Sequence, residues 1–538
     1  MSNYHIITPE QLANLIAVTP PDDPWILDTE TDGLEVIGPK SKHRAHWVGL
    51  MPTGRTAALC LTAGDFAAVQ HLLDDRLIVG HNIRFDLHAL NWFPSRIQCT
   101  MADKYFCNTT GKKSLDHCAR LMGRAKITTP DELKKGLILS MDQDRLCTYL
   151  ADDVLATDAI YRGAGRGCPD GPLELAVACM EDRGVRLLRS PLAELGITLG
   201  KEIETSRTRL QVLGFSGNPG SPKQVLEYFR GQGRELKTTD KMMMEKLSAE
   251  GDAFADALLK WRKNSKLWSA FYKPLSMSPC LIHARVNTTR TATGRFSYQD
   301  PNLQQIPKRS KLGKRFRSCF TGEGYHVSGA DFSQVELRVA AALAQEPTLL
   351  QAFAQGRDPH TEVAAQMLGK KLDKVTPEER FGAKAVNFGI MNGMGAKRLS
   401  HELKSSLPEA RRFLDSYRRS MPKLTDWMEA IWAETEDTLV ARTGVGRTRI
   451  FRPDDSTRPA VSVIVQGTAA ELMRHALVKV NQAGLEPILV VHDEIVCNTL
   501  DRGQEVATIM TQAANEAFGD PSVDFKADPG QGGTWNDI

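Results

Sequence analysis

The chain has 538 residues, too many for a single core, so two to four domains are expected. Its hydrophobic content of 41% and charged content of 25% are typical of a globular protein, and a net charge of +3 does not by itself indicate nucleic acid. Ten cysteines without a CxxC pair exclude a zinc ribbon and indicate reduced thiols. Because there is no signal-peptide pattern and no run of roughly 18 apolar residues, we expect a cytoplasmic protein without membrane contact.

Residues 24–160 alternate between strand and helix patterns, which predicts an α/β layer. The strand PWILDTE ends in Asp28 and Glu30, and residues two apart face the same side of a strand. Asp86 follows a second strand, DRLIVGHN, while Tyr149 and Asp153 lie one turn apart in a helix predicted from DELKKG to ATDAIYR. Alone, each signal is typical of a solvated strand end or helix face; together, four carboxylates can hold two divalent cations.

A Gly/Pro-rich stretch at 162–172 interrupts this pattern and is the first expected domain boundary. From about 173 to 280 the pattern is mostly helical and ends in a basic amphipathic helix. The remaining segments are predicted to be strand-like at 281–340, helical at 345–440, and a mixture of hairpin, helix and strand at 441–500.

Two distant segments each place an aspartate beside an apolar strand. Asp331 opens DFSQVELR, and Asp493 follows the run PILVV, between His492 and Glu494. Two strands that present such acids side by side can hold a pair of magnesium ions, and two metals can stabilise both the attacking and the leaving oxygen of an in-line phosphoryl displacement. The two segments therefore predict a second metal site.

Cationic residues accompany these acids. Arg380, Lys384 and Phe388 share one face of a predicted helix, and two cations beside a flat ring suit a triphosphate and a base. Nine Lys or Arg residues and one acid lie between Arg285 and Arg317, which is typical either of a phosphate-contacting track or of a solvated basic surface.

In their order and spacing, these segments resemble the family A (Pol I-like) DNA polymerases from about residue 20 to the C-terminus. The resemblance includes TATGRFSYQDPNLQQIP and VQGTAAELM, and the N-terminal acids look like a 3′–5′ exonuclease of the DEDDy type. It implies an α/β exonuclease domain with a ribonuclease H-like mixed sheet, and an α+β right-hand polymerase domain with palm, fingers and thumb. The expected domains are the exonuclease at 1–165, the thumb at 173–284, the palm at 285–345 and 441–538, and the fingers at 346–440.

The resemblance also implies roles for individual residues. Two Mg²⁺ ions per site, with Mn²⁺ as a substitute, are expected on the metal ligands of the two sites. These ligands are Asp331 and Asp493 for polymerisation and Asp28, Glu30, Asp86 and Asp153 for the exonuclease. Glu494, Lys384 and Tyr149 are further expected catalytic residues, Tyr149 because it can position the attacking water.

Substrate contacts follow from the same resemblance. The expected nucleotide-binding residues are Arg380, Lys384, Phe388, Glu336, His360 and Gln334, with Glu336 excluding a ribose 2′-OH. The expected minor-groove and primer-end readers are Arg295, Asn302, Gln304, Gln466 and His492, with phosphate contacts from Arg285, Lys308 and Arg315. Ordinary structural alternatives are a Glu336 paired with Arg338, a His360 that caps a helix, and a Phe388 in a helix core.

Two positions depart from the family pattern, since Asn392 stands where a tyrosine is usual and Ser462 where an asparagine is common. Neither loss touches a metal ligand. The partners implied are primer-template DNA and deoxynucleoside triphosphates, for a monomer that works with replisome partners. Since the chain begins almost directly in the exonuclease, we expect a phage-type enzyme without a 5′-nuclease domain. The alternatives are a nuclease with a degenerate polymerase half and a DNA-binding scaffold.

Overall fold

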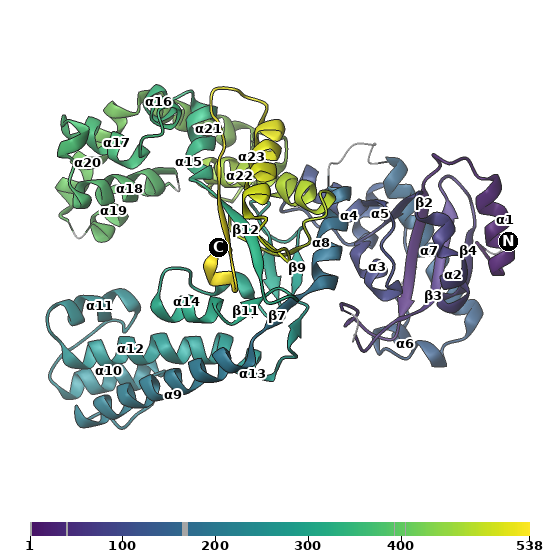
Figure 1. The fold of residues 1–538 in the computed structure, drawn as a ribbon, viewed down its shortest axis with the longest axis horizontal. Coiled ribbons are helices and arrows are strands. Elements are labelled where there is room, and N and C mark those ends of the chain that lie inside the picture. The colour runs from purple at the N-terminus through teal and green to yellow at the C-terminus, as the bar shows by residue number, and fades with distance from the viewer. Residues whose placement is uncertain (1–2, 39–40, 128, 164–169, 392, 404) are drawn as a thin grey trace.

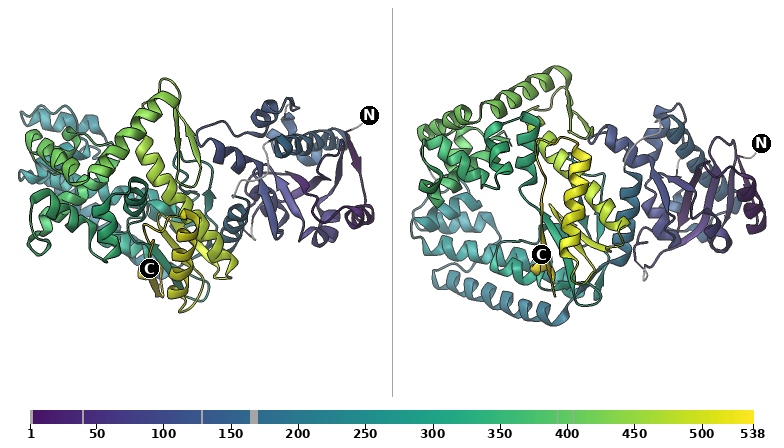
Figure 2. Two further views of the ribbon diagram at one scale, coloured as in Figure 1. Left: turned by 90° about the horizontal axis from the view of Figure 1, so that it is seen from above. Right: turned by 45° about the horizontal axis from the view of Figure 1, so that its top comes forward.

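The computed structural model describes residues 3–38, 41–127, 129–163, 170–391, 393–403 and 405–538. An N-terminal α/β region lies beside a larger region in which helices extend from a central sheet in two separate groups (Figures 1 and 2). Among the described residues, no helix is long and apolar enough to cross a membrane.

A mixed six-stranded sheet forms the centre of the N-terminal region, in the order β1-β4-β3-β2-β5-β6. The largely buried strand β2 (Trp25–Thr31) pairs antiparallel with β3 (Ala45–Pro52) and parallel with β5 (Leu77–Gly80). Both strands predicted here are therefore present. The remaining strands and the helices around the sheet are β1 (Tyr4–Ile6), β4 (Ala58–Thr62), β6 (Arg96–Cys99), α1 (Pro9–Val18), α2 (Ala63–Val69), α3 (Arg84–Leu90), α4 (Thr100–Cys107) and α5 (Leu115–Leu121).

The helix predicted from residue 131 onward is broken in the structure. It consists of α6 (Asp131–Lys134), a 3-10 turn at Ile138–Ser140, and the long helix α7 (Gln143–Gly163). Gly136 lies between the first two with φ 69°, a left-handed conformation that ends α6 and that glycine adopts without strain. The predicted boundary at 162–172 falls largely on residues 164–169, outside the described residues.

Helix α8 (Gly171–Arg183) connects the two regions through its side chains. Ala178 belongs to the hydrophobic core of the N-terminal region, whereas Leu173, Val177 and Met180 belong to the core of the larger region. A helix buried on several faces in this way holds the two regions in a fixed relation.

The first group of helices has its own small core, which contains Phe215, Phe229 and Phe254. It is the lower left group in Figure 1. Its helices are α9 (Arg189–Val212), α10 (Pro222–Gly231), α11 (Lys241–Ala249), α12 (Ala253–Leu267) and α13 (Lys273–Met277), with a π-helical turn at Trp268–Tyr272 before α13. The predicted helical character of 173–280 is thus present.

The central sheet of the larger region has the strand order β15-β16-β12-β17. Its strands are β12 (Val327–Phe332), β15 (Pro487–Val491), β16 (Glu494–Cys497) and β17 (Ala527–Gly532). The helices α22 (Ala460–Gln482) and α23 (Gly503–Phe518) pack on the sheet, and α15 (Val335–Ala344) packs on α22. Smaller elements of this region are β7 (Val185–Leu187), β8 (Leu281–Ile282), β9 (Arg285–Asn287), β10 (Ser297–Gln299), α14 (Lys311–Arg317), β11 (Phe320–Thr321), β13 (Val440–Arg442) and β14 (Thr448–Ile450).

The second group of helices is inserted between β12 and β15 in sequence and lies at the upper left of Figure 1. It is helical throughout, as predicted for 345–440. Its members are α16 (Pro347–Ala354), α17 (Pro359–Leu368), α18 (Pro377–Met391), α19 (Ala396–Glu402), α20 (Leu407–Ser420) and α21 (Pro422–Thr438).

Candidate active sites

The four N-terminal acids converge at one place on the six-stranded sheet. Asp28 and Glu30 lie on β2, and their carboxylate oxygens and one of Asp153 on α7 are all within 4.8 Å of one another. Asp86, in the first turn of α3, accepts hydrogen bonds from the backbone N of Thr29 at 3.0 Å and from its Oγ1 at 2.7 Å. The fourth acid is therefore tied to the strand that carries the first two.

Burial raises the pKa of every carboxyl group in this N-terminal acid cluster. The pKa of Glu30 is raised to about 8, that of Asp86 to about 7 and that of Asp153 to about 6. Burial, and then the charges of the other three acids, raise the pKa of Asp28 well above its ordinary range. Buried carboxylates that repel one another require a counter-charge, and an all-oxygen donor set fits a hard divalent cation.

Lys126 supplies one counter-charge that the sequence did not reveal. Its Nζ lies 2.7 Å from Oδ1 of Asp153 and donates to the hydroxyl oxygen of Tyr149 at 2.6 Å. The ammonium also lies 4.3 Å from the centre of the Tyr149 ring. Tyr149 and Asp153 thus lie together, as their helical spacing predicts, but a lysine from a distant loop joins them.

Asp331 and Asp493 lie close together, Asp331 on β12 and Asp493 in the turn that joins β15 to β16. Asp331 lies opposite Glu494 in the ladder between β12 and β16, and the backbone N of Phe332 donates to the carbonyl of Asp493 at 2.8 Å. His492 has φ 56°, which allows His492 and Asp493 to form the two-residue connection between β15 and β16. Glycine is required on β12, because a Cβ at Gly329 would lie 2.3 Å from the carbonyl oxygen of Ile495.

Cations surround this second acid cluster (Asp331, Asp493 and Glu494). Lys308 forms an ion pair with Asp331, and its Nζ lies 2.7 Å from Oε2 of Glu494. Glu494 is only 1% exposed and also binds Arg317 at 3.1 Å and the indole N–H of Trp535. Glu494 is therefore a buried anchor for cations that lie beside the two aspartates. Lys308, expected to contact a phosphate, lies against acids here.

The carboxyl group of Asp493 is held partly protonated at neutral pH. Burial raises its pKa to about 7, the charges of Glu336 and Asp331 act in the same direction, and Arg295 and Lys308 oppose them. Asp493 therefore lies among two acids and two cations that come from residues 295–336, far from it in the sequence. A divalent cation would be a stronger counter-charge for it than either distant cation.

Glu336 pairs with Arg295 beside Asp493. Its carboxylate accepts from the Arg295 guanidinium, whereas Arg338 donates to the backbone carbonyls of Ser333 at 2.9 Å and Asp524 at 2.6 Å. The alternative pairing of Glu336 with Arg338 is therefore wrong. Gln334, just before α15, has φ 52°, and its buried Oε1 has no hydrogen-bond partner among the described residues.

The helices α17 and α18 bring the predicted nucleotide-binding cations together. Arg380 binds Asp358 through Nε at 2.7 Å and Nη2 at 3.0 Å, and Asp358, not His360, caps α17 by accepting from Thr361 N at 2.9 Å. The capping alternative for His360 is thus wrong. His360 is buried 3.1 Å from the Asn387 amide, and burial lowers its pKa to about 4.

Lys384 lies on the same face as Arg380, as the spacing predicts. Burial and the charges of Arg309 and Arg380 lower the pKa of Lys384, so a third cation, Arg309, lies near them. The side chain of Phe388 and the whole of Asn392 lie outside the described residues. Ser462, on α22, donates to the carbonyl of Pro459 at 2.9 Å.

Four of the five predicted DNA-reading residues lie on three elements of the larger region. Asn302 and Gln304 lie at the 3-10 turn Leu303–Gln305, Gln466 lies on α22, and His492 lies in the β15–β16 turn. Burial lowers the pKa of His492, followed by the charges of Arg295 and Arg317. Two expected phosphate contacts are engaged elsewhere, since Arg315 binds Thr198 at 3.0 Å and Arg285 binds the carbonyl of Leu34 at 3.0 Å.

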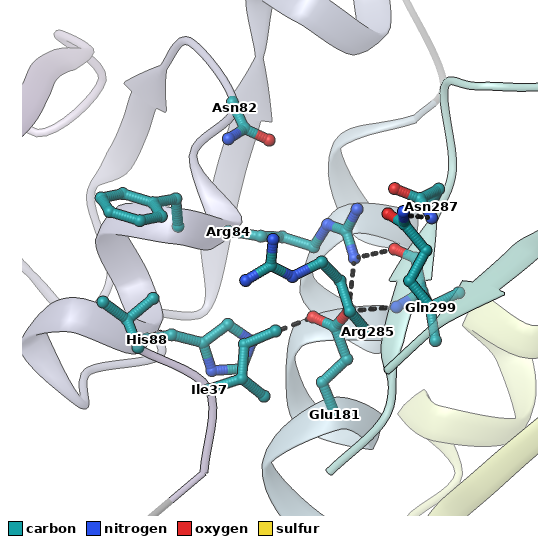
Figure 3. Close-up of a pocket in the computed structure, with 11 residues that line it drawn as sticks. Ile37, Asn82, Arg84, His88, Glu181, Arg285, Asn287 and Gln299 are labelled. Carbon is teal, nitrogen blue, oxygen red and sulfur yellow. Dashed lines mark hydrogen bonds and ion pairs between the residues drawn. The ribbon is translucent and has the colours of Figure 1, made fainter. Parts of the chain in front are cut away.

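A cavity of about 160 Å³ lies where the N-terminal region meets the larger one (Figure 3). Glu181 of α8 lines it and binds Arg84 at 3.1 Å, His88 at 3.0 Å and the backbone N of Val286 at 2.6 Å. These contacts join α3, α8 and β9. The cavity is therefore bounded by a buried polar network that fixes one region against the other.

Comparison with known proteins agrees with this geometry. The family model described as DNA polymerase family A matches residues 189–537, and the model described as 3′–5′ exonuclease matches residues 4–162. The chain belongs to DNA polymerase family A. Members of this family and exonucleases of this kind generally depend on divalent metals, which agrees with two clusters of carboxylates.

Several bacterial DNA polymerases I are similar to this family A chain. The thermostable enzymes of Thermus filiformis and Thermus aquaticus are 36% and 35% identical over 399 residues, 68% of this chain and 47% of each relative. The enzyme of Rhizobium leguminosarum is 30% identical over 513 residues, 85% of this chain and 50% of the relative. The chain therefore spans about half the length of the curated relatives it matches, and since these are bacterial, its phage origin stays a prediction.

A solved structure shares the fold of this family A chain. It is described as the POL domain of Pol1 from M. smegmatis in complex with DNA primer-template and dNTP. The match has a TM-score of 0.85 at 23% identity and covers 99% of both chains. At that identity the likeness establishes the fold.

Proposed function

We propose that this chain is a template-directed DNA polymerase that extends a primer 3′-OH and proofreads with a 3′–5′ exonuclease. Membership of DNA polymerase family A supports the proposal, together with two separate clusters of acids, one in each matched segment. The right-hand architecture is part of it, with the exonuclease at 1–165, the thumb at 173–284, the palm at 285–345 and 441–538, and the fingers at 346–440. The exonuclease sheet is then of the ribonuclease H type.

Asp331 and Asp493 would hold the metal ions of polymerisation, for which Mg²⁺ is the proposed ion and Mn²⁺ a substitute. The fit rests on one carboxylate on β12 and one in the β15–β16 turn, and burial raises the pKa of the second to about 7, which a cation would relieve. When bound, such ions activate the attacking oxygen and neutralise the charge that develops in phosphoryl transfer. Before binding, Lys308 shields the acids, and Glu494 with Arg317 keeps Lys308 at the edge of the site.

The nucleotide would be held by cations of the fingers. Arg380 and Lys384 face one direction on α18, and His360 from α17 stays neutral because burial lowers its pKa to about 4. A neutral imidazole can donate one hydrogen bond to a phosphate oxygen without adding charge. The Asp358 carboxylate keeps the Arg380 guanidinium extended and oriented until a triphosphate competes for it.

Glu336 would select the sugar. Its carboxylate is fixed by Arg295, and both side chains act on Asp493, so the pair lies at the edge of the proposed metal site. A fixed carboxylate there disfavours an additional 2′-hydroxyl by contact and by loss of hydrogen bonding. Gln334, Phe388 and the DNA-reading residues Arg295, Asn302, Gln304, Gln466 and His492 keep the roles that the resemblance implies.

The exonuclease would hold its ions with Asp28, Glu30, Asp86 and Asp153. Tyr149 lies one turn from Asp153, so its hydroxyl is available to orient the attacking water. We further propose a cytoplasmic monomer whose partners are primer-template DNA, deoxynucleoside triphosphates and replisome proteins.

Primer extension on a labelled duplex tests the polymerase directly. We expect template-dependent extension with Mg²⁺, none with EDTA, and a loss of about 10³-fold or more in Asp493→Asn because a ligand of the ion is removed. The matched control is Asp501→Asn, a surface acid at the end of the same region that is expected to keep full activity. Extension by Asp493→Asn at the wild-type rate would refute the assignment. Retained 3′-end degradation by the same variant shows that the protein is folded.

A further inference from the structure

The side chain of Lys126 is held in a defined position within the N-terminal acid cluster. Its side chain is only 9% exposed, although lysine is a residue that is rarely buried. The loop that carries it is fastened to α7 by Asp152, which accepts from Nη2 of Arg124 and from the backbone N of Ile127, both at 2.7 Å. Two consecutive acids on α7 thus have different partners: Asp152 binds the loop, and Asp153 forms an ion pair with the ammonium group of Lys126.

In the hydrogen bond between Lys126 and Tyr149, the donor and the acceptor are fixed. An ammonium group only donates hydrogen bonds, so the Tyr149 oxygen must accept from Lys126 through a lone pair. Thr129 Oγ1 lies 3.1 Å from the same oxygen, and the ammonium also lies over the Tyr149 ring. These contacts fix the ring, and since Lys126 occupies a lone pair of the oxygen, the phenolic hydrogen is left for Thr129 or for the other groups of the site.

We propose that Lys126 is a positioning residue of the exonuclease with two effects, both of which rest on the proposed exonuclease function. It holds the Tyr149 hydroxyl in the orientation needed to guide water, and its ammonium competes with divalent cations for Asp153. The second effect follows from the 2.7 Å contact, because a cation that binds the same carboxylate must displace the amine and is repelled by it. Lys126 therefore weakens metal binding to the cluster and increases exonuclease turnover.

The two effects predict opposite changes in Lys126→Met. Exonuclease turnover at saturating Mg²⁺ should fall by about tenfold or more, the usual scale for groups that orient ligands and catalytic side chains. Binding of Mn²⁺ to the cluster, measured by electron paramagnetic resonance without DNA at a pH of about 8.5, should tighten by about tenfold. A background of Asp331→Asn and Asp493→Asn removes the other proposed ion site from this titration. A merely structural lysine would not tighten metal binding.

A double-mutant cycle with Tyr149→Phe tests whether Lys126 acts through the tyrosine. The double variant should turn over within about twofold of Tyr149→Phe alone, because residues that act through one group are not additive. The matched control is Lys134→Met, in which an exposed lysine bonded to Asp131 is lost and both readouts should stay at wild-type values. If Lys126→Met melts early, Lys126→Gln, which keeps a donor without the charge, replaces it and should still tighten Mn²⁺ binding.

The outcomes separate this inference from the function on which it rests. Turnover of Lys126→Met at the wild-type rate, unchanged or weaker Mn²⁺ binding, or multiplicative effects in the cycle would each overturn the role of Lys126. Wild-type protein that fails to degrade 3′ ends, like Asp28→Asn/Glu30→Gln, would instead overturn the exonuclease itself.

Discussion

Replacing Glu30 by Gln should stabilise the metal-free protein at high pH. Burial raises the pKa of Glu30 from 4.5 to about 8, so the folded protein holds a proton there that the unfolded chain releases. A group with a raised pKa contributes stability that is fully present below pH 4.5 and is lost as the pH rises toward about 8. Gln carries no charge at any pH and escapes this loss.

The size of the effect follows from the shift. At ~1.36 kcal/mol per pKa unit the ceiling is about 5 kcal/mol, and because the neighbouring acids share the titration we expect on the order of 3 kcal/mol. For a region of this size, each kcal/mol moves the melting temperature by about 2–4 °C. Glu30→Gln in EDTA should therefore melt roughly 6–12 °C above wild type at pH 8 and at nearly the same temperature at pH 5.

The assay is the melting temperature of the exonuclease region, monitored by near-UV circular dichroism in EDTA and in Mg²⁺. With Mg²⁺ at pH 8 the wild-type protein should melt at the higher temperature, because its carboxylates gain a bound cation whereas the variant lacks one ligand. Glu505→Gln, an exposed acid that pairs with Arg502, is the matched control and should not shift the melt. Equal melting of wild type and Glu30→Gln in EDTA at pH 8 would refute the reasoning on burial and repulsion.

Three further predictions follow from contacts in the larger region. Glu336→Ala should incorporate ribonucleotides at least about tenfold more readily relative to deoxynucleotides in single-nucleotide insertion; unaltered sugar selectivity would remove the proposed gate. Asp170→Asn should destabilise the protein by about 3–5 kcal/mol in urea denaturation, because Arg447 at 2.8 Å and Arg474 at 3.2 Å lose their buried counter-charge; a loss below about 1 kcal/mol would contradict it. Gly329→Ala should lower the free energy of unfolding by about 1–3 kcal/mol and reduce primer extension more than 3′-end degradation.

The sequence predicts the acids well because short-range periodicity places them. Asp28 and Glu30 share a face through strand alternation, and Tyr149 and Asp153 through helical spacing. For Asp331 and Asp493, each motif predicts an acid beside a strand, while the pairing of those strands comes from the resemblance. In the structure the register of β12 with β16 brings them together.

The cations that neutralise these acids could not be predicted in the same way. Lys126 and Lys308 reach their carboxylates across 27 and 23 positions through loops, and no local pattern encodes such a contact. The signal available was the excess of buried acids, which requires nearby positive charge without saying where it comes from. The partner of Glu336 could not be predicted from the sequence either. Its neighbour Arg338 donates to backbone carbonyls, and Glu336 forms its ion pair with Arg295.

A primer with a mismatched 3′ end on a long template tests the central claim, that one chain both copies and proofreads. Wild-type protein with Mg²⁺ and deoxynucleotides should yield full-length product in which the mismatch has been corrected. Asp28→Asn/Glu30→Gln should stall or retain the mismatch, and Asp493→Asn should only shorten the primer. If wild-type protein retained the mismatch, or if either variant gave corrected full-length product, the account of two separate acid sites with two separate activities would be contradicted.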